Sequence, residues 1–170
     1  MITYKANFFD VAKNVYFKKN SPVSLIHFLT NRCNARCSFC FIDFDNPNVF
    51  TKELDINEID LLTKNLGKSL LNVNLTGGEP FARKDIIDIA KKYLTNTTIQ
   101  SMYITTNASL PDRIENFAKE INKFDNEAEL TFQISIDDLP ENHDKVRKID
   151  NLFDKCIESY KLLKNFPENI

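Results

Sequence analysis

The chain has 170 residues, of which 42% are hydrophobic and 27% are charged, the proportions of an ordinary globular domain. This composition excludes a disordered chain, a collagen-like repeat and a mucin-like stalk, and no apolar run approaches the roughly 18 residues of a membrane span. The net charge of −2 and the pI near 5.7 predict no binding surface for nucleic acid or an anionic membrane. The N-terminus lacks the long apolar stretch of a signal peptide, so a cytosolic protein is expected.

Predicted strands and helices alternate along the chain. The strands are expected at residues 24–29, 71–76, 98–105 and 129–136. The helices after them are expected to begin near Asp55, Arg83, Pro111 and Asp150. The first of these helices has a capping box formed by Asp55 and Glu58, and apolar spacing over residues 6–18 allows one more amphipathic helix. The alternation predicts an α/β fold with a parallel sheet and right-handed crossovers.

Two of the predicted strands have one polar face. Their apolar residues, Leu71, Val73, Leu75, Leu130, Phe132, Ile134 and Ile136, alternate with the polar residues Asn72, Asn74, Thr76, Thr131, Gln133, Ser135 and Asp137. Buried parallel strands are normally apolar on both faces, and polar groups are costly in a sealed core. We therefore expect the polar faces to line a cavity that holds a polar ligand. A solvated sheet face is the alternative.

Three of the four cysteines, Cys33, Cys37 and Cys40, lie within eight residues, directly after the first predicted strand. In a cytosolic protein, thiols grouped in this way bind a metal or carry out redox chemistry. A structural zinc site needs four ligands, usually from paired Cys-x-x-Cys units, and the sequence has no second pair. The candidates for a fourth ligand are Cys156, His27 and His143. Because Cys156 lies on an apolar helical stripe, it is expected to be a buried structural thiol.

Three thiolates without an evident fourth fit an iron–sulfur cluster that leaves one iron open. The segment CNARCSFC, residues 33–40, resembles the CxxxCxΦC motif of radical S-adenosylmethionine (radical SAM) enzymes, with Phe39 at the aromatic position. The resemblance implies that the three cysteines are catalytic and metal-binding, and that they hold a [4Fe–4S] cluster whose open iron binds SAM, with Phe39 at the cofactor site. It also implies that the cluster reduces SAM and that a 5′-deoxyadenosyl radical then abstracts hydrogen from a substrate.

Two of only three glycines in the chain, Gly77 and Gly78, are adjacent, and Glu79 and Pro80 follow them. Glycines let the backbone approach a ligand without a Cβ in the way. Pro80 favours an extended Glu79, whose carboxylate can accept charge-assisted hydrogen bonds from an ammonium group. This sequence resembles the GGEP motif after the second strand of radical SAM enzymes, which implies that Gly77, Gly78 and Glu79 bind the methionyl amine of SAM. A glycine turn with a solvated glutamate is the alternative.

Two weaker motifs follow in the order that the family shows. Asn107 closes a stretch that resembles the family's TNG sequence, with Ala108 where glycine is common, which predicts a less open turn. Residues 135–148 resemble its SIDG…HDxxRG region. The two glycine positions of that region hold Asp138 and Lys148. The resemblance implies that Asn107, Ser135 and Asp137 bind SAM; polar strand ends satisfied by backbone are the alternative.

Four other charged residues lie near these motifs. His143 and Arg147 are four residues apart, and we expect them on a short helical turn in a structural rather than a catalytic role. Arg32 and Arg36 lie beside the first two cysteines and could offset thiolate charge. Solvated loop arginines are the alternative for that pair.

The resemblance extends over residues 24–166 and implies a partial (β/α) barrel with parallel strands. The family's core usually has six βα units, whereas about four are predicted here. We therefore expect residues 1–23 to be an N-terminal extension, and residues 24–170 to be a radical SAM core that is incomplete at its C-terminus. The fourth strand would be an open edge, covered by more of a longer protein, by a partner or by a second copy.

The implied partners are a one-electron donor, such as flavodoxin or ferredoxin, and a polar substrate. Peptides are among the candidate substrates, because the motifs are in the style of peptide-modifying and cofactor-building members. Neither nucleic acid nor a membrane is expected as a partner. Two other hypotheses stay open: a non-catalytic module that binds the cluster or SAM and needs a partner, and a zinc-stabilised interaction domain.

Overall fold

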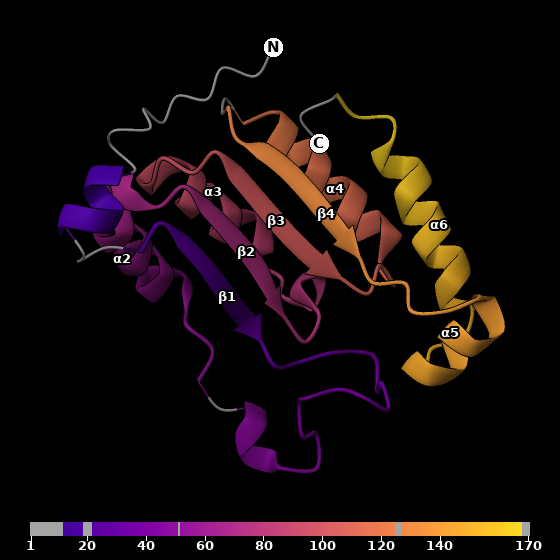
Figure 1. Cartoon of the computed structure of the whole chain (residues 1–170). Helices are drawn as coiled ribbons and strands as arrows, with labels where there is room; N and C mark the ends of the chain where they lie inside the picture. Colours follow the sequence, from indigo (N-terminus) through magenta and orange to yellow (C-terminus); the bar gives the residue numbers. More distant parts are fainter. Residues whose placement is uncertain (1–11, 19–21, 51, 125–126, 168–170) are drawn as a thin grey trace.

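The described part of the chain forms a four-stranded sheet in the order β1-β2-β3-β4 (Figure 1). The computed structural model describes residues 12–18, 22–50, 52–124 and 127–167. The strands are β1 Ser24–Thr30, β2 Asn72–Gly77, β3 Ser101–Thr106 and β4 Glu129–Ile134. Every pairing is parallel, so the carboxyl ends of all four strands meet at one edge of the sheet. The predicted parallel α/β sheet is therefore confirmed.

Helices lie before, between and after the strands. They are α2 Ile56–Leu66, α3 Ile86–Asn96, α4 Pro111–Asn122, α5 Pro140–Arg147 and α6 Leu152–Leu163, with the short helices η1 Lys13–Lys18, η2 Pro47–Phe50, η3 Gly67–Ser69 and η4 Pro80–Ala82. None of the helices in the described residues has the length and apolar character that a membrane span requires. The order of strands and helices matches the one predicted from the sequence.

The structure differs from the predicted elements in several places. β4 ends at Ile134 rather than at residue 136. β3 begins at Ser101 rather than at residue 98, and the Gln100 amide just before it donates to the Leu71 carbonyl at 2.7 Å. Residues 140–147 form a full helix where only a helical turn was expected. Of the helix allowed over residues 6–18, residues 6–11 lie outside the described residues, and Lys13–Lys18 form a π-helix.

The two faces of the sheet differ in what covers them. On one face, apolar side chains of the strands pack against α3 and α4, which lie behind the sheet in Figure 1. The fully buried members of this core include Val73, Leu75, Met102, Ile104, Ile89, Tyr93 and Phe117. The opposite face, toward the viewer in Figure 1, is not covered by α2, α3, α4 or α6. The fold therefore leaves one face of the sheet accessible to a ligand.

The uncovered face carries polar side chains on β2, β3 and β4. Asn74, Thr105 and Gln133 come from β2, β3 and β4, and the Thr105 hydroxyl lies 3.2 Å from Asn74 Oδ1 and 2.8 Å from Gln133 Oε1. The Asn74 amide also lies 3.4 Å from Gln133 Oε1. The polar faces that the sequence predicts for β2 and β4 thus lie on the same side and are joined by hydrogen bonds. We call these three side chains the polar floor.

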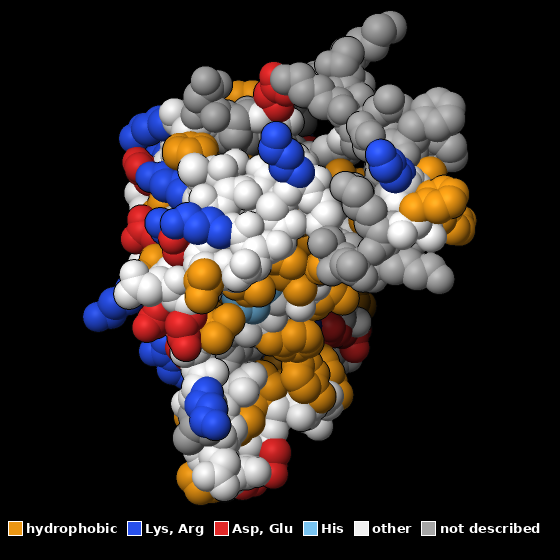
Figure 2. Space-filling view, turned by 90° about the vertical axis from the view of Figure 1, so that its left-hand side faces the viewer, with side chains coloured by type: hydrophobic (Ala, Val, Ile, Leu, Met, Phe, Trp, Pro, Cys, Tyr) orange, Lys and Arg blue, Asp and Glu red, His pale blue; other side chains and the backbone are white. Residues whose placement is uncertain are grey.

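An apolar surface borders this floor on the β1 side, where hydrophobic side chains gather in Figure 2. Ile26, Phe28 and Phe41 are 62%, 53% and 74% exposed. The rings of Phe28 and Phe41 meet edge to face, with centroids 5.7 Å apart, a favourable arrangement for aromatic pairs. The open side of the sheet therefore offers both amide groups and aromatic rings.

The segment between β1 and α2 carries the three grouped cysteines, and we call it the cysteine loop. It is described over residues 31–50 and 52–55 and lies at the carboxyl end of β1 (Figure 1). It ends at the predicted capping box, which is confirmed: the Asp55 carboxylate accepts hydrogen bonds from the Asn57 and Glu58 amides, and Glu58 Oε2 accepts from the Asp55 amide at 2.9 Å. The cap fixes where the loop ends and α2 begins.

A partly buried polar pair links β1 to α3 behind the sheet. His27 Nδ1 lies 2.8 Å from the Tyr93 hydroxyl, and Tyr93 is fully buried. Burial, together with the positive charge of Arg83, lowers the pKa of His27 to about 4. His27 is therefore neutral in the folded chain at neutral pH.

This pair makes a prediction about acid stability. Between pH 6.5 and 4 the unfolded chain binds a proton at His27 and the folded chain does not, so acid favours unfolding. As the pH falls from 6.5 to 4, the free energy of unfolding should decrease in the natural chain by on the order of 2 kcal/mol more than it does in His27→Gln. This figure allows for the partial exposure of the imidazole ring. Urea unfolding at several pH values measures this difference. Equal pH dependence in the two chains would contradict the assignment.

Candidate metal centre and cofactor site

Cys33, Cys37 and Cys40 lie together on the cysteine loop, half-buried at the carboxyl ends of the strands. Backbone amides point at two of the sulfurs: the Ala35 amide donates to Cys33 Sγ at 3.3 Å, and the Ile42 amide donates to Cys40 Sγ at 3.4 Å. Amides directed at cysteine sulfur stabilise thiolate charge and tune iron–sulfur centres. The loop thus carries three thiols, and backbone amides near two of them would stabilise a thiolate that binds a metal.

The donors do not form a closed site for one ion. Within the described ranges, no three His, Cys, Asp or Glu side chains converge closely enough to hold a single metal ion. A structural zinc site requires four such ligands around one point.

The surroundings of two of these thiols, Cys33 and Cys37, favour the protonated form. Burial raises the pKa of Cys33, and the nearby Glu79, Cys37 and Cys40 raise it further. Burial also raises the pKa of Cys37, against the opposing positive charge of Arg147. Ligation therefore has to displace protons from the thiols.

Cys156 lies apart from this chemistry, in the core. It is fully buried on α6, and its thiol donates to the Asn107 carbonyl, with a sulfur–oxygen distance of 3.4 Å. Its sulfur also lies 3.9 Å from His143 Nε2, and burial raises the pKa of Cys156 to about 11. These contacts agree with the structural role expected for Cys156 and His143.

The adjacent glycines lie against the start of the cysteine loop. The Gly78 amide donates to the Thr30 carbonyl at 2.7 Å, and the Glu79 amide donates to the Arg32 carbonyl at 2.9 Å. A Cβ on Gly78 would lie 2.3 Å from the Arg32 carbonyl oxygen. The close approach anticipated for this pair is thus an approach to the chain's own backbone, and binding of SAM by Gly77 and Gly78 stays a prediction.

Glu79 is fully buried and joins the end of β2 to the end of β3. Its carboxylate accepts hydrogen bonds from the Phe81 amide at 3.0 Å, the Thr106 hydroxyl at 2.8 Å and the Asn107 amide at 2.8 Å. Burial raises the pKa of Glu79, and these hydrogen bonds oppose the rise. The solvated glutamate considered from the sequence is therefore wrong. Three donors of the chain already occupy most of the carboxylate, which has about four acceptor sites.

Asn107 connects β3 to the cysteine loop. Its side-chain amide donates to Asn34 Oδ1 at 3.0 Å and lies 3.8 Å from Cys33 Sγ. The next residue, Ala108, has a φ of +56°, so the turn keeps the left-handed backbone that glycine favours. The less open turn expected from the alanine is therefore wrong.

The last turn of α5 holds the tip of the cysteine loop. The Arg36 amide donates to the Arg147 carbonyl, and the Ser38 amide donates to the Val146 carbonyl, both at 3.2 Å. The last carbonyls of a helix have no partner within the helix, and here the cysteine loop supplies two. The helix ends at Lys148 with a φ of +56°, which explains why glycine suits this position.

Asp137 holds this helix through Arg147. Its two carboxylate oxygens accept from Arg147 Nε at 2.6 Å and Arg147 Nη2 at 2.9 Å. This pairing holds the pKa of Asp137 below its usual value. The Arg147 guanidinium also lies 5.8 Å from the centroid of the Phe39 ring, which is 60% exposed. Ser135, at the end of β4, donates its amide to the Thr106 carbonyl at 3.0 Å.

The two loop arginines make different contacts. Arg32 pairs with Glu53, and Arg36 donates to the Cys33 and Ala35 carbonyls, both at 2.7 Å, while its guanidinium lies 4.0 Å from the centroid of the Phe44 ring. Glu53 was not predicted from the sequence to lie at the site, and Arg83 was predicted only as the start of a helix. A signal for Arg83 existed, because a positive charge at a helix N-terminus opposes the helix dipole and so calls for another role.

The glycine contact predicts an effect on stability. Gly78→Ala should lower the free energy of unfolding by about 3 kcal/mol, because the new Cβ meets backbone that cannot move cheaply. Gly67→Ala is the control: Gly67 has a φ of +53° but nothing within 4 Å of its Cβ position, so the cost should be about 1 kcal/mol. Urea unfolding compares the two, and equal losses would refute the steric explanation.

Known proteins resemble this chain in sequence. The model of the Radical SAM superfamily matches residues 28–167. The chain is 32% identical over 120 residues to GTP 3',8-cyclase from Pasteurella multocida (strain Pm70). This alignment covers 65% of this chain and 32% of that enzyme. It is 40% identical over 75 residues to PqqA peptide cyclase from Methylorubrum extorquens (strain PA1). This alignment covers 42% of this chain and 19% of that enzyme. The chain thus spans less than half the length of these curated relatives.

A solved structure shares the fold. Streptococcus suis SuiB bound to S-adenosylmethionine matches with a TM-score of 0.63 at 22% sequence identity, over 98% of this chain and 38% of that chain. At this identity the likeness concerns the fold alone. It agrees with the predicted partial α/β architecture of four parallel strands and alternating helices.

Proposed function

The chain belongs to the radical SAM superfamily, and we propose that it carries out the superfamily's chemistry with Cys33, Cys37 and Cys40 as ligands of three irons of a [4Fe–4S] cluster. The family membership assigns the cluster and SAM as cofactors. When bound, they supply one-electron reduction of the SAM sulfonium and a 5′-deoxyadenosyl radical that takes a hydrogen atom from the substrate. The observation that carries the proposal is the set of three half-buried thiols on one loop, at the carboxyl ends of a parallel sheet.

The residues around the thiols fit a cluster. Amides of Ala35 and Ile42 donate to Cys33 Sγ and Cys40 Sγ, and the side-chain amide of Asn107 lies 3.8 Å from the first of these sulfurs. Such donors offset the negative charge of thiolates bound to iron. No additional cysteine of the described chain lies on this loop, which leaves one iron of the proposed cluster for SAM.

We assign the SAM site to the groups that surround this loop. Gly77, Gly78 and Glu79 would take the methionyl amine, with one acceptor site of Glu79 still open beside its three hydrogen bonds. The other proposed SAM-binding residues are Phe39, Asn107, Ser135 and Asp137. Because Arg147 occupies both oxygens of Asp137, we propose that Asp137 acts on SAM by orienting its neighbours.

The uncovered sheet face supports a peptide as the substrate. The polar floor of Asn74, Thr105 and Gln133 offers amide and hydroxyl groups, and the exposed rings of Phe28 and Phe41 border it. The four strands contain no lysine or arginine, the residues that bind phosphate groups. A neutral polar chain with apolar side chains suits this surface better than a nucleoside triphosphate does.

Two protein partners complete the proposal. Reduction of the cluster requires a one-electron donor, and a flavodoxin or ferredoxin is the expected kind. Within the described residues, β4 pairs with β3 alone, so we expect a partner, a second copy or more of a longer chain along its other edge. A non-catalytic module that binds the cofactors is the competing hypothesis, and it differs in whether SAM is cleaved.

The test is anaerobic reconstitution with iron and sulfide, followed by SAM and dithionite, with chromatographic detection of 5′-deoxyadenosine. The natural chain should bind four irons of a [4Fe–4S] cluster and form product. Cys37→Ala should lose both, because it lacks one of the three protein ligands.

Cys156→Ala is the matched control for this experiment. Its thiol contacts Asn107 and His143 in the core, so the iron content should match that of the natural chain. Loss of iron in this control would overturn the ligand assignment, and a bound cluster without product would favour the non-catalytic module.

A further inference from the structure

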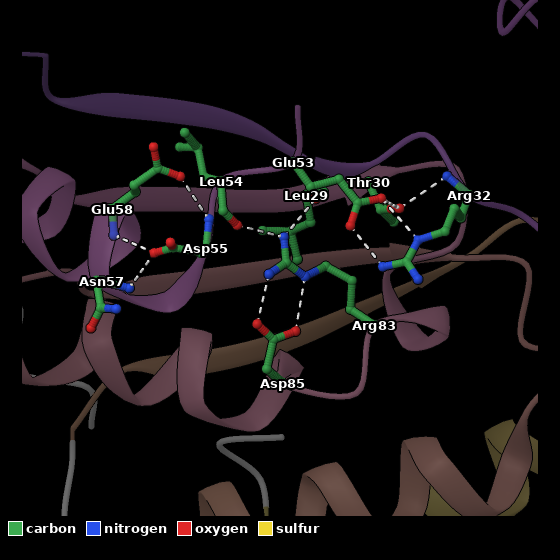
Figure 3. Close-up of polar contacts among 10 residues, drawn as sticks. All are labelled: Leu29, Thr30, Arg32, Glu53, Leu54, Asp55, Asn57, Glu58, Arg83 and Asp85. Atoms are coloured by element: carbon green, nitrogen blue, oxygen red, sulfur yellow. Dashed lines mark hydrogen bonds and ion pairs between the residues drawn. The ribbon is translucent and has the colours of Figure 1, made fainter. Parts of the chain in front are cut away.

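Arg83 lies at the base of the cysteine loop and is buried, with 4% of its surface exposed. Nη1 of its guanidinium donates to the Leu29 carbonyl at 2.9 Å and to the Leu54 carbonyl at 3.0 Å. Leu29 is the penultimate residue of β1, and Leu54 precedes the cap of α2 (Figure 3). One side chain from a distant part of the sequence thus binds the backbone at both ends of the loop.

We propose that Arg83 is a positioning residue that closes the base of the cysteine loop and so fixes the three thiols for cluster binding. The cluster-binding part of this inference rests on the proposed function. Closing a long loop costs conformational entropy. The hydrogen bonds of the buried guanidinium to both ends of the loop offset this cost in the folded chain. The loop is then ordered before any metal binds.

Asp85 orients the guanidinium. Its carboxylate accepts from Arg83 Nε at 2.9 Å and from Nη2 at 2.6 Å, and this pairing holds the pKa of Asp85 below its usual value. Asp85 is the N-cap residue of α3, yet its side chain makes no capping hydrogen bond. Aspartate at this position normally stabilises the helix by capping it. Here the carboxylate is used to hold Arg83, which indicates a role beyond the helix itself.

A second, outer contact closes the same loop. Arg32 donates to Glu53 through Nε at 2.9 Å and Nη2 at 2.7 Å, and the Thr30 hydroxyl also donates to Glu53 (Figure 3). The Arg32 side chain is 57% exposed, and exposed ion pairs contribute little to stability. The buried contacts of Arg83 should therefore dominate the closure.

Lysine cannot replace this arginine. The planar guanidinium binds two carbonyls and a carboxylate at once, whereas an ammonium group at the end of a flexible chain lacks that fork. Arg83→Lys keeps the positive charge and changes only this geometry. The matched control is Arg113→Lys on α4, where the arginine is exposed.

The experiment is amide hydrogen exchange on the metal-free 170-residue chain. In Arg83→Lys, amides within the loop, such as those of Cys40 and Val49, should exchange about tenfold faster or more, the factor that corresponds to about 1.4 kcal/mol. Amides of α4 should change less than those of the loop, and Arg113→Lys should match the natural chain. Unchanged loop exchange, or equal acceleration throughout the chain, would overturn the inference.

Iron release is the second readout. The reconstituted Arg83→Lys variant should lose iron to a chelator about tenfold faster than the natural chain, as expected when a preorganised site becomes mobile. Unchanged release despite a loosened loop would overturn the positioning role. If Arg83→Lys does not fold, Asp85→Asn serves instead, with a smaller acceleration confined to the same loop. If the natural chain binds no cluster, the proposed function fails, and the exchange data still decide whether Arg83 closes the loop.

Discussion

The backbone of Gly78 lies so close to the start of the cysteine loop that no side chain fits between them, and the rest of the site depends on this contact. The amides of Gly78 and Glu79 donate to the Thr30 and Arg32 carbonyls, which continues the pairing of β1 and β2 beyond the ends of the strands. The position of the first cysteine is therefore set by the sheet itself. Because the neighbours that a Cβ would meet are backbone atoms, the contact tolerates little adjustment.

From this contact, hydrogen bonds cross the carboxyl ends of all four strands. Glu79 joins β2 to β3 through Thr106 and Asn107, and Asp137, after β4, holds the helix whose last carbonyls bind the loop. In the described residues, no buried side-chain nitrogen or oxygen lacks a partner. A satisfied network in a low-dielectric setting is rigid, which is what a cluster and its bound cofactor require of their ligands.

The two faces of the sheet have different roles. The buried face supplies the apolar core that stabilises the fold, and the other face presents hydrogen-bonded amides and hydroxyls beside exposed aromatic rings. The loop at the strand ends would supply the ligands for chemistry that belongs to the cofactors. The open face also touches the loop, because the Phe28 ring of β1 packs against the Phe41 ring of the cysteine loop.

The sequence by itself determined the order of strands and helices, the capping box at Asp55 and the grouping of the three cysteines, because periodicity and spacing are properties of neighbouring residues. It could not decide which groups meet across the sheet. The partners of Gly78, Glu79 and Asp137 came only with the tertiary structure, as did the left-handed turn at Ala108. Arg83 shows the reason most clearly, since its partners Leu29 and Leu54 are 54 and 29 residues away. Hydrogen bonds over such separations depend on how the strands pair, and that pairing exists only once the whole sheet has formed.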